Sequence, residues 1–314
     1  MALDSPHETL PTEAEQDRHA AMRRRGIGLA GAAALAGMGL LGSARPALAT
    51  NANNTTFGEP TGPADADIFN FALNLEYLEA EFYLYAATGS GLSAADRIGT
   101  GTQGTVSPGA AVPFKSVAIQ QYAQRIAVDE QAHVRFIRAV LGAGAVAEPT
   151  IDVGIGPNSA FSKLAVAAGL IVAGQTFNPY ADDISFLLGA SIFEDVGVTA
   201  YAGAARYIGT PDYLEAAAGI LAVEAYHSGA VRTLLANIGA GTAFGLISNL
   251  RKTLSGKNDD QGILIPGNNY NFIPNDVNAL AFRRSTSQVL NIVYGNTTAA
   301  PGLFFPNGLN GNIR

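Results

Sequence analysis

Apolar side chains recur at helical spacing in four long stretches of the chain, at about residues 65–88, 114–141, 182–208 and 211–238. A spacing of three and four residues places side chains on one face of an α-helix, so the pattern predicts four long helices. Glycine and proline residues near the ends of these stretches agree with the predicted boundaries. Only a short turn separates the last two stretches, which favours an antiparallel pair.

The segments between these helices differ in length and composition. A Gly/Ser/Thr-rich loop at residues 89–112 joins the first two helices, and a long crossing stretch at 142–180 contains a short helix at about 159–172. Beyond Gly239 the chain is rich in Asn, Gly and Pro, with one further helix expected near residues 275–294. The sequence therefore predicts an all-α protein, a four-helix bundle with a long crossover and an irregular C-terminal extension.

The N-terminal residues have the pattern of a targeting segment. Three arginines, Arg23 to Arg25, precede a Gly/Ala-rich apolar run, and an Ala-x-Ala sequence ends at Ala49. The run is short and glycine-rich for a membrane span, and the paired arginines resemble a twin-arginine export signal. We expect residues 1–49 to be cleaved after Ala49 and the mature protein, without a membrane span, to work in the periplasm or outside the cell. An ordinary secretory signal and a retained anchor are the alternatives.

The mature chain then divides into a polar leader at 50–64, the bundle at 65–240 and the extension at 241–314. Its composition, 48% hydrophobic and 14% charged over 314 residues, is that of a globular protein. The net charge of −7 and the lack of a Lys/Arg stripe argue against a nucleic-acid partner. Because the chain has no cysteine, any metal must be held by oxygen and nitrogen atoms.

Two Glu-x-x-His units carry the strongest chemical signal. Outside the predicted signal segment, His133 and His227 are the only histidines, and each follows a glutamate, Glu130 or Glu224, by three residues. This spacing puts a carboxylate and an imidazole one turn apart on the same helix face. The neighbouring residues are mostly apolar, and buried ionisable groups need partners or a metal ion.

The first and third helices contribute a matching pair of glutamates. Glu76 lies seven residues before Tyr83, and Glu194 lies seven residues before Tyr201. The order Glu, Glu-x-x-His therefore occurs twice along the chain. This repetition indicates two copies of one helical hairpin related by an approximate twofold axis.

Four glutamates and two histidines in this order resemble the ferritin-like superfamily over about residues 65–240. Within it, the phrases ALNLEYLEAEFYLY, FEDVGVTAY and STSQVLNIVYG resemble the branch of exported ferritin-like and desiccation-related proteins. The resemblance implies a ferritin-like bundle that binds two iron or manganese ions. The metal identity stays open, because zinc would also bind this ligand set. The implied ligands are Glu76, Glu130, His133, Glu194, Glu224 and His227.

Several nearby residues have two interpretations each. Glu79, one turn beyond Glu76, is either a further or bridging ligand or, as we favour, an ordinary hydrogen-bonding group. Tyr83 and Tyr201 could act beside the metals, as hydrogen-bond donors to the ligands or as redox-active phenols. We favour the other interpretation, in which they are core residues whose hydroxyl groups are hydrogen-bonded. Asp129 and Asp195 adjoin proposed ligands and can each accept the second N–H of a ligating histidine.

Other charged residues of these helices are assigned to the surface. Glu81 is expected to be exposed to solvent, and Arg125, Arg135 and Arg138 are expected to cover the outer face of the second helix.

Two classes of function follow from the pattern. In the first, the protein is a redox-active dinuclear metalloprotein, peroxidase- or catalase-like or ferroxidase-like, whose partner is a small-molecule oxidant or a metal ion. In the second, the bundle is a structural scaffold of an exported stress or desiccation protein. A third interpretation, iron storage in a hollow shell, requires a large homo-oligomer that no residue pattern establishes.

Overall fold

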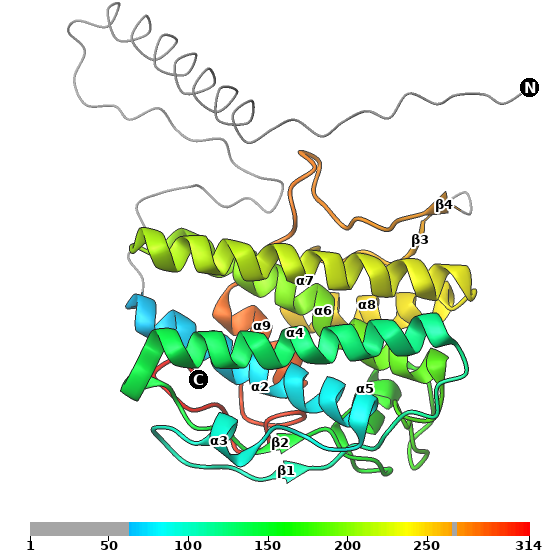
Figure 1. Ribbon diagram of the computed structural model, residues 1–314. Coiled ribbons are helices and arrows are strands. Elements are labelled where there is room, and N and C mark those ends of the chain that lie inside the picture. Colours follow the sequence, from blue (N-terminus) through cyan, green and yellow to red (C-terminus); the bar gives the residue numbers. More distant parts are fainter. Residues whose placement is uncertain (1–62, 266–268) are drawn as a thin grey trace, which may run out of the picture. The chain divides into compact units, whose positions relative to one another are not determined.

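Four long helices lie side by side in the structure, a computed structural model that describes residues 63–265 and 269–314 (Figure 1). The predicted export signal and most of the polar leader lie outside these residues. The all-α bundle expected from the sequence is confirmed. Its helices are α2 (Asp65–Thr88), α4 (Val117–Leu141), α6 (Asp183–Ala204), which continues into the 3₁₀ turn η2 (Ala205–Tyr207), and α7 (Pro211–Asn237).

Local signals explain where these helices begin and end. The side chains of Ser116 and Asp182 accept hydrogen bonds from backbone N–H groups of the first turns of α4 and α6. Pro211 is the first residue of α7. Proline is tolerated there because a backbone N–H in the first turn has no acceptor within the helix. Gly89 ends α2 with φ of 79°, a left-handed conformation that glycine adopts without steric cost.

The four helices differ in how much of their surface is buried. Side chains on nearly every face of α2 and α6 are buried, whereas α4 and α7 each keep an exposed face. These exposed faces carry polar and small residues together with larger apolar ones such as Phe136 and Tyr226. A helix that is apolar all round needs cover on all sides. Part of that cover for α6 comes from segments beyond the bundle, α8 (Gly241–Ser255) and α9 (Thr286–Tyr294).

The loop after α2 and the crossover between the two hairpins run beside each other. The loop contains α3 (Ala94–Arg97) and β1 (Val106–Ser107), and the crossover contains η1 (Gly142–Gly144), β2 (Ile151–Asp152) and α5 (Ala160–Ala168). Strands β1 and β2 pair in parallel, with Val106 opposite Ile151 and Ser107 opposite Asp152. This pairing fastens the crossover to the first hairpin.

The C-terminal extension contains two helices, α8 and α9, where the sequence predicted one, and this prediction is corrected. Helix α8 was missed because Gly241, Gly245 and Asn249 weaken its local helix propensity. Its buried side chains, including Phe244 and Ile247, stabilise it by packing instead. Between α8 and α9, β3 (Leu264–Ile265) and β4 (Asn269–Tyr270) form a short antiparallel pair.

The expected packing of the extension on the bundle is present. The backbone N–H of Asn310 donates to Oδ1 of Asn74 on α2 at 3.0 Å, and its side-chain amide donates to the carbonyls of Thr102 and Ala147 at 2.8 Å. The backbone and side chain of Asn310 thus tie together α2, the first loop and the crossover.

Among the described residues, one helical segment, Asp183–Tyr207, is long and apolar enough to cross a membrane. It corresponds to α6 and η2, and 89% of its most apolar window is buried inside the protein. Burial in the bundle core accounts for its composition.

A second buried acidic pair lies beside α2, and it corrects one expectation. Glu81, predicted to be exposed, is only 1% exposed, because the loop after α2 and the crossover cover this face of the helix. Its Oε1 accepts the backbone N–H of Leu92 at 3.1 Å, and the Glu148 carboxylate accepts a hydrogen bond from Nε of Arg97. One oxygen of each glutamate has no hydrogen-bond partner in good geometry among the described residues, and we expect the two carboxyl groups to share a proton.

Burial raises the pKa of both carboxyl groups, and Glu81 adds to the rise that brings the pKa of Glu148 to about 8. In the unfolded chain both groups lose their protons near the ordinary glutamate value. Between the ordinary glutamate pKa and about pH 8, the folded protein therefore binds more protons than the unfolded chain. Its free energy of unfolding falls as the pH rises toward 8.

We predict that Glu81→Gln lessens this decline. The amide supplies a permanent N–H in place of the shared proton and keeps an acceptor for Leu92. Between about pH 6 and about pH 8.5, the unaltered protein should lose up to about 1.4 kcal/mol of unfolding free energy per pH unit from this pair, and the variant much less. Urea unfolding at both pH values measures this, with exposed Glu215→Gln as the control. Equal declines in Glu81→Gln and the unaltered protein would contradict the shared proton.

Candidate metal centre

The six side chains marked as ligands by the sequence lie together in the interior of the bundle. The four glutamates are at most 2% exposed, and the two imidazoles are 8% and 6% exposed. The Glu-x-x-His spacing on α4 and α7 directs both side chains of each unit inward, as the helical period requires. The residues are Glu76 on α2, Glu130 and His133 on α4, Glu194 on α6, and Glu224 and His227 on α7.

The first group surrounds His133. Its Nδ1 atom lies 3.2 Å from Oε2 of Glu76, 3.2 Å from Oε2 of Glu130 and 3.7 Å from Oε1 of Glu224. One oxygen or nitrogen atom from each of the four residues lies within 4.8 Å of the others, close enough to surround one metal ion.

The second group surrounds His227 and shares Glu130 with the first. Nδ1 of His227 lies 3.0 Å from Oε1 of Glu130 and 3.5 Å from Oε2 of Glu194. The two oxygens of Glu130 thus face different histidines, Oε2 toward His133 and Oε1 toward His227. A carboxylate in this position can bridge two ions.

The polar atoms of this cluster are better placed to bind a metal ion than to hydrogen-bond with one another. Six of its buried atoms have no hydrogen-bond donor or acceptor in good geometry, which costs free energy unless a cation is bound. Carboxylate oxygen with imidazole nitrogen is the donor set that iron, manganese and zinc accept. The six atoms are Oε2 of Glu76, Oε1 of Glu130, Oε2 of Glu194, both carboxylate oxygens of Glu224 and Nδ1 of His227.

A sequence model of the family described as ferritin-like domain matches residues 64–237, more than half of the chain. The chain belongs to the ferritin-like domain family. The matched residues contain all four bundle helices and all six candidate ligands, whereas α8 and α9 lie outside the match.

Two curated relatives share more of the chain than the ferritin-like domain. The "Ferritin-like catalase Nec2" of Nesocodon mauritianus is 28% identical over 272 residues, covering 80% of this chain and 85% of the relative. The "Desiccation-related protein PCC13-62" of Craterostigma plantagineum is 30% identical over 272 residues, covering 79% of this chain and 83% of the relative.

The two tyrosines of the repeat reach across the ferritin-like bundle to each other's glutamates. Tyr83 on α2 donates to Oε1 of Glu194 on α6, and Tyr201 on α6 donates to Oε1 of Glu76 on α2. Burial and the adjacent carboxylates raise the pKa of both phenols well above the ordinary value of 10, so both remain donors. Each tyrosine holds one oxygen of a glutamate and leaves the other directed at the histidines.

The two aspartates expected beside the histidines have different partners. Oδ2 of Asp129 lies 3.2 Å from Nε2 of His227, on the opposite helix, and Arg125 pairs with Asp129 at 2.6 Å. This contact favours the His227 tautomer with a proton on Nε2, leaving Nδ1 free to bind a metal. Asp195 has no hydrogen bond or ion pair with either described histidine, and its carboxylate binds Ser228, Arg232 and Arg251 instead.

The approximate twofold repeat is broken at Glu79, beside the candidate ligands. Glu79 lies three residues after Glu76, and the matching residue after Glu194 is Gly197. A Cβ atom at Gly197 would lie 2.1 Å from Oε2 of Glu224, so the glycine makes room for that carboxylate. Gly197 is not a ligand-type residue, and the repeat spacing is the sequence signal that points to it.

Glu79 is buried but belongs to neither candidate ligand group. Burial first, and then the charges of Glu130, Glu194 and Glu76, raise its pKa well above the ordinary glutamate value. Burial therefore favours the protonated form of this carboxyl group, and the repeat places it on the α2 side of the site only.

The electrostatics of the cluster is dominated by its carboxylates. Burial alone would lower the pKa of His133 and His227, but their glutamate neighbours raise both to about 12. Burial also raises the pKa of Glu76 to about 7 and that of Glu224 well above its ordinary value. In the metal-free protein, protons on the imidazoles therefore supply the positive charge that the carboxylates require.

We predict that metal binding releases protons. Mn(II) needs neutral imidazoles and ionised carboxylates, so its binding displaces two protons from His133 and His227 and further protons from Glu76 and Glu224, and its apparent affinity rises with pH. Calorimetric titration of metal-free protein in buffers of different ionisation enthalpy measures the proton count. A heat of binding that does not depend on the buffer would contradict the charged histidines.

We also predict that Gly197→Ala displaces the Glu224 carboxylate and weakens metal binding, because helix backbone cannot give way by the required distance. The control is Gly219→Ala on α7, where the new methyl group meets no atom within 4 Å. That variant should gain up to about 1 kcal/mol of stability from helix propensity. Metal content per chain and thermal unfolding separate the two variants, and normal metal content in Gly197→Ala would contradict the prediction.

Proposed function

We propose that this ferritin-like protein binds two iron or manganese ions between α2, α4, α6 and α7 and reacts with hydrogen peroxide or dioxygen, or oxidises Fe(II). The observation that carries the proposal is the position of Glu130, whose two oxygens face two separate histidines. Glu76, Glu130, His133 and Glu224 would hold one ion, and Glu130, Glu194 and His227 the other. Two such ions, when bound, supply Lewis acidity and the ability to exchange electrons.

The protein's own residues prepare this site. Tyr83 orients Glu194, Tyr201 orients Glu76, and Asp129 orients His227. Burial of all six ligand candidates excludes bulk water and admits only small reactants.

Peroxide is the reactant best matched to this chain. Without cysteine, the protein has no thiolate-bound iron centre to deliver electrons. Hydrogen peroxide needs no such donor, because one molecule is oxidised to dioxygen while a second is reduced to water. The printed name of one relative, a ferritin-like catalase, supports the same reaction class.

The competing function is that of a structural protein whose metal only holds the helices together. The name of the second relative, a desiccation-related protein, favours it. A structural metal is fully coordinated and inert, whereas a catalytic one keeps a position open for substrate. Reactivity therefore separates the two functions.

We further propose that the protein is exported. The arginines at positions 23–25, the apolar run after them and the Ala-x-Ala sequence ending at Ala49 support a twin-arginine-like signal cleaved after Ala49. These residues lie outside the described part of the chain, so the proposal rests on the sequence.

We predict that Glu130→Gln and His133→Ala reduce the bound metal from about two ions per chain to less than about one, since each removes a ligand that is not replaced. The control is Gln121→Ala, an exposed position on the same helix. Elemental analysis after loading with Fe(II) or Mn(II) gives the stoichiometry, and unchanged values in both variants would exclude the site. The loaded, unaltered protein should then release oxygen from peroxide. A loaded protein inert toward peroxide and dioxygen would favour the scaffold.

A further inference from the structure

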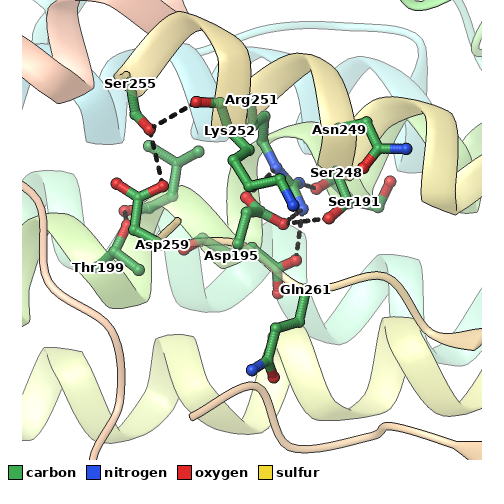
Figure 2. Close-up of polar contacts among 12 residues, drawn as sticks. Ser191, Asp195, Thr199, Ser248, Asn249, Arg251, Lys252, Ser255, Asp259 and Gln261 are labelled. Carbon is green, nitrogen blue, oxygen red and sulfur yellow. Dashed lines mark hydrogen bonds and ion pairs between the residues drawn. The ribbon is translucent and has the colours of Figure 1, made fainter. Parts of the chain in front are cut away.

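A second cluster of charged residues is buried between α6, α7 and the C-terminal extension (Figure 2). It contains three guanidinium groups and three carboxylates, none more than 6% exposed, so its charges balance. None of them belongs to the candidate metal centre. The six residues are Asp195, Arg232, Arg251, Asp259, Asp260 and Arg284.

Asp195 lies where this cluster meets the candidate metal centre. Its Oδ1 accepts a 2.6 Å hydrogen bond from the hydroxyl of Ser228 on α7. Asp195 directly follows Glu194, and Ser228 directly follows His227. One hydrogen bond therefore joins α6 to α7 immediately beside the two ligand candidates that these helices provide.

The extension holds Asp195 from the other side. Arg251 of α8 donates to Oδ2 of Asp195 at 2.6 Å and to the backbone carbonyl of Ser191, while two further bonds join it to Asp260. Figure 2 shows Asp195 and Ser191 of α6 facing Arg251 and Ser248 of α8. The guanidinium thus fixes both the side chain and a backbone carbonyl of α6.

A third attachment lies one turn further along α6. The backbone N–H of Arg284 donates to the carbonyl of Thr199 at 2.9 Å, and its guanidinium donates to the Thr199 hydroxyl at 3.0 Å. The same guanidinium binds Asp259 and Asp260. Ser191, Asp195 and Thr199 are spaced four residues apart, so the extension grips one continuous stripe of α6.

The first half of the repeat is held differently at the same positions. Tyr77, which follows Glu76 as Asp195 follows Glu194, accepts a 2.6 Å hydrogen bond from Arg138, five residues after His133. Arg232, five residues after His227, binds Asp195 in the same way at 3.1 Å. Both halves link the residue after the glutamate to an arginine beyond the histidine, but only the second half adds contacts from α8.

We propose that the C-terminal extension positions the second half of the metal centre: through Arg251, Asp195 and Ser228 it sets how α6 and α7 are rotated and thus where Glu194 and His227 point. Asp195, Ser228 and Arg251 are positioning residues. The proposal rests on the proposed metal-binding function and gives a role to helices outside the matched ferritin-like domain.

The choice of charged groups supports positioning over stabilisation. Replacing a buried ion pair by apolar residues of similar size often leaves a protein equally or more stable. Apolar packing tolerates small rotations of a helix, whereas several directional hydrogen bonds along one stripe do not.

The test uses Ser228→Ala and Arg251→Lys, with Ser255→Ala as the matched control. Ser255 is also a buried serine, and its hydroxyl donates to Oδ1 of Asp259 at 2.7 Å, but within the described part of the chain it forms no hydrogen bond with α6 or α7. Metal-free full-length protein is titrated with Mn(II). Calorimetry gives the two affinities, electron paramagnetic resonance distinguishes coupled from isolated Mn(II), and thermal unfolding is recorded in parallel.

We expect Ser228→Ala and Arg251→Lys to weaken one of the two Mn(II) sites by about 10-fold to 100-fold and to give the signal of isolated Mn(II). Ser255→Ala should lower the unfolding temperature comparably and leave both affinities and the coupled signal unchanged. Unchanged binding in Ser228→Ala, or an equal loss in Ser255→Ala, overturns the proposal. If Ser228→Ala weakens Mn(II) binding and Arg251→Lys does not, the proposed role of the extension is overturned. If the unaltered protein itself binds no Mn(II), the proposed function fails first.

Discussion

Carboxylates buried against one another are the constraint on which this structure depends. Four glutamates with almost no solvent exposure converge on two imidazoles, and Glu79 lies beside them. Such a group is unfavourable in a protein interior unless positive charge accompanies it, and the raised pKa values of Glu76 and Glu224 show this cost. The imidazoles provide that charge without metal, and metal ions would replace it. The all-round burial of α2 and α6 has a further source, because the first loop, the crossover and the extension cover the faces of these helices that the bundle leaves open.

The second theme is symmetry that is complete at the ligands and broken around them. Both hairpins contribute a glutamate, a Glu-x-x-His unit and a tyrosine that reaches the opposite glutamate. The residues one step further out differ: Glu79 stands opposite Gly197 in the repeat, and Tyr77 opposite Asp195. The two ion positions therefore have different neighbours, which gives a dinuclear centre a means of treating its two metals unequally.

Membership of the ferritin-like family accounts for the bundle, and the segments that connect or follow its four helices account for much of what supports it. The first loop and the crossover cover α2 through Glu81, Glu148 and Arg97, while α8 and the segment before α9 hold α6 through charged groups. Interactions of this kind leave the ligand set unchanged and alter its surroundings.

The sequence by itself determined the four bundle helices and the six candidate ligands, since both depend on spacing within a helix. Helical period places His133 beside Glu130 and His227 beside Glu224, and the repeated order extends the set to Glu76 and Glu194. Tertiary structure alone decided which groups meet across the bundle: that Asp129 contacts His227, that Asp195 contacts arginines, and that Glu81 is buried. Helix α8 was also decided by the tertiary structure, because packing of its buried side chains stabilises it despite its weak local helix propensity. These features depend on residues far apart in the chain, whose contacts no local spacing specifies.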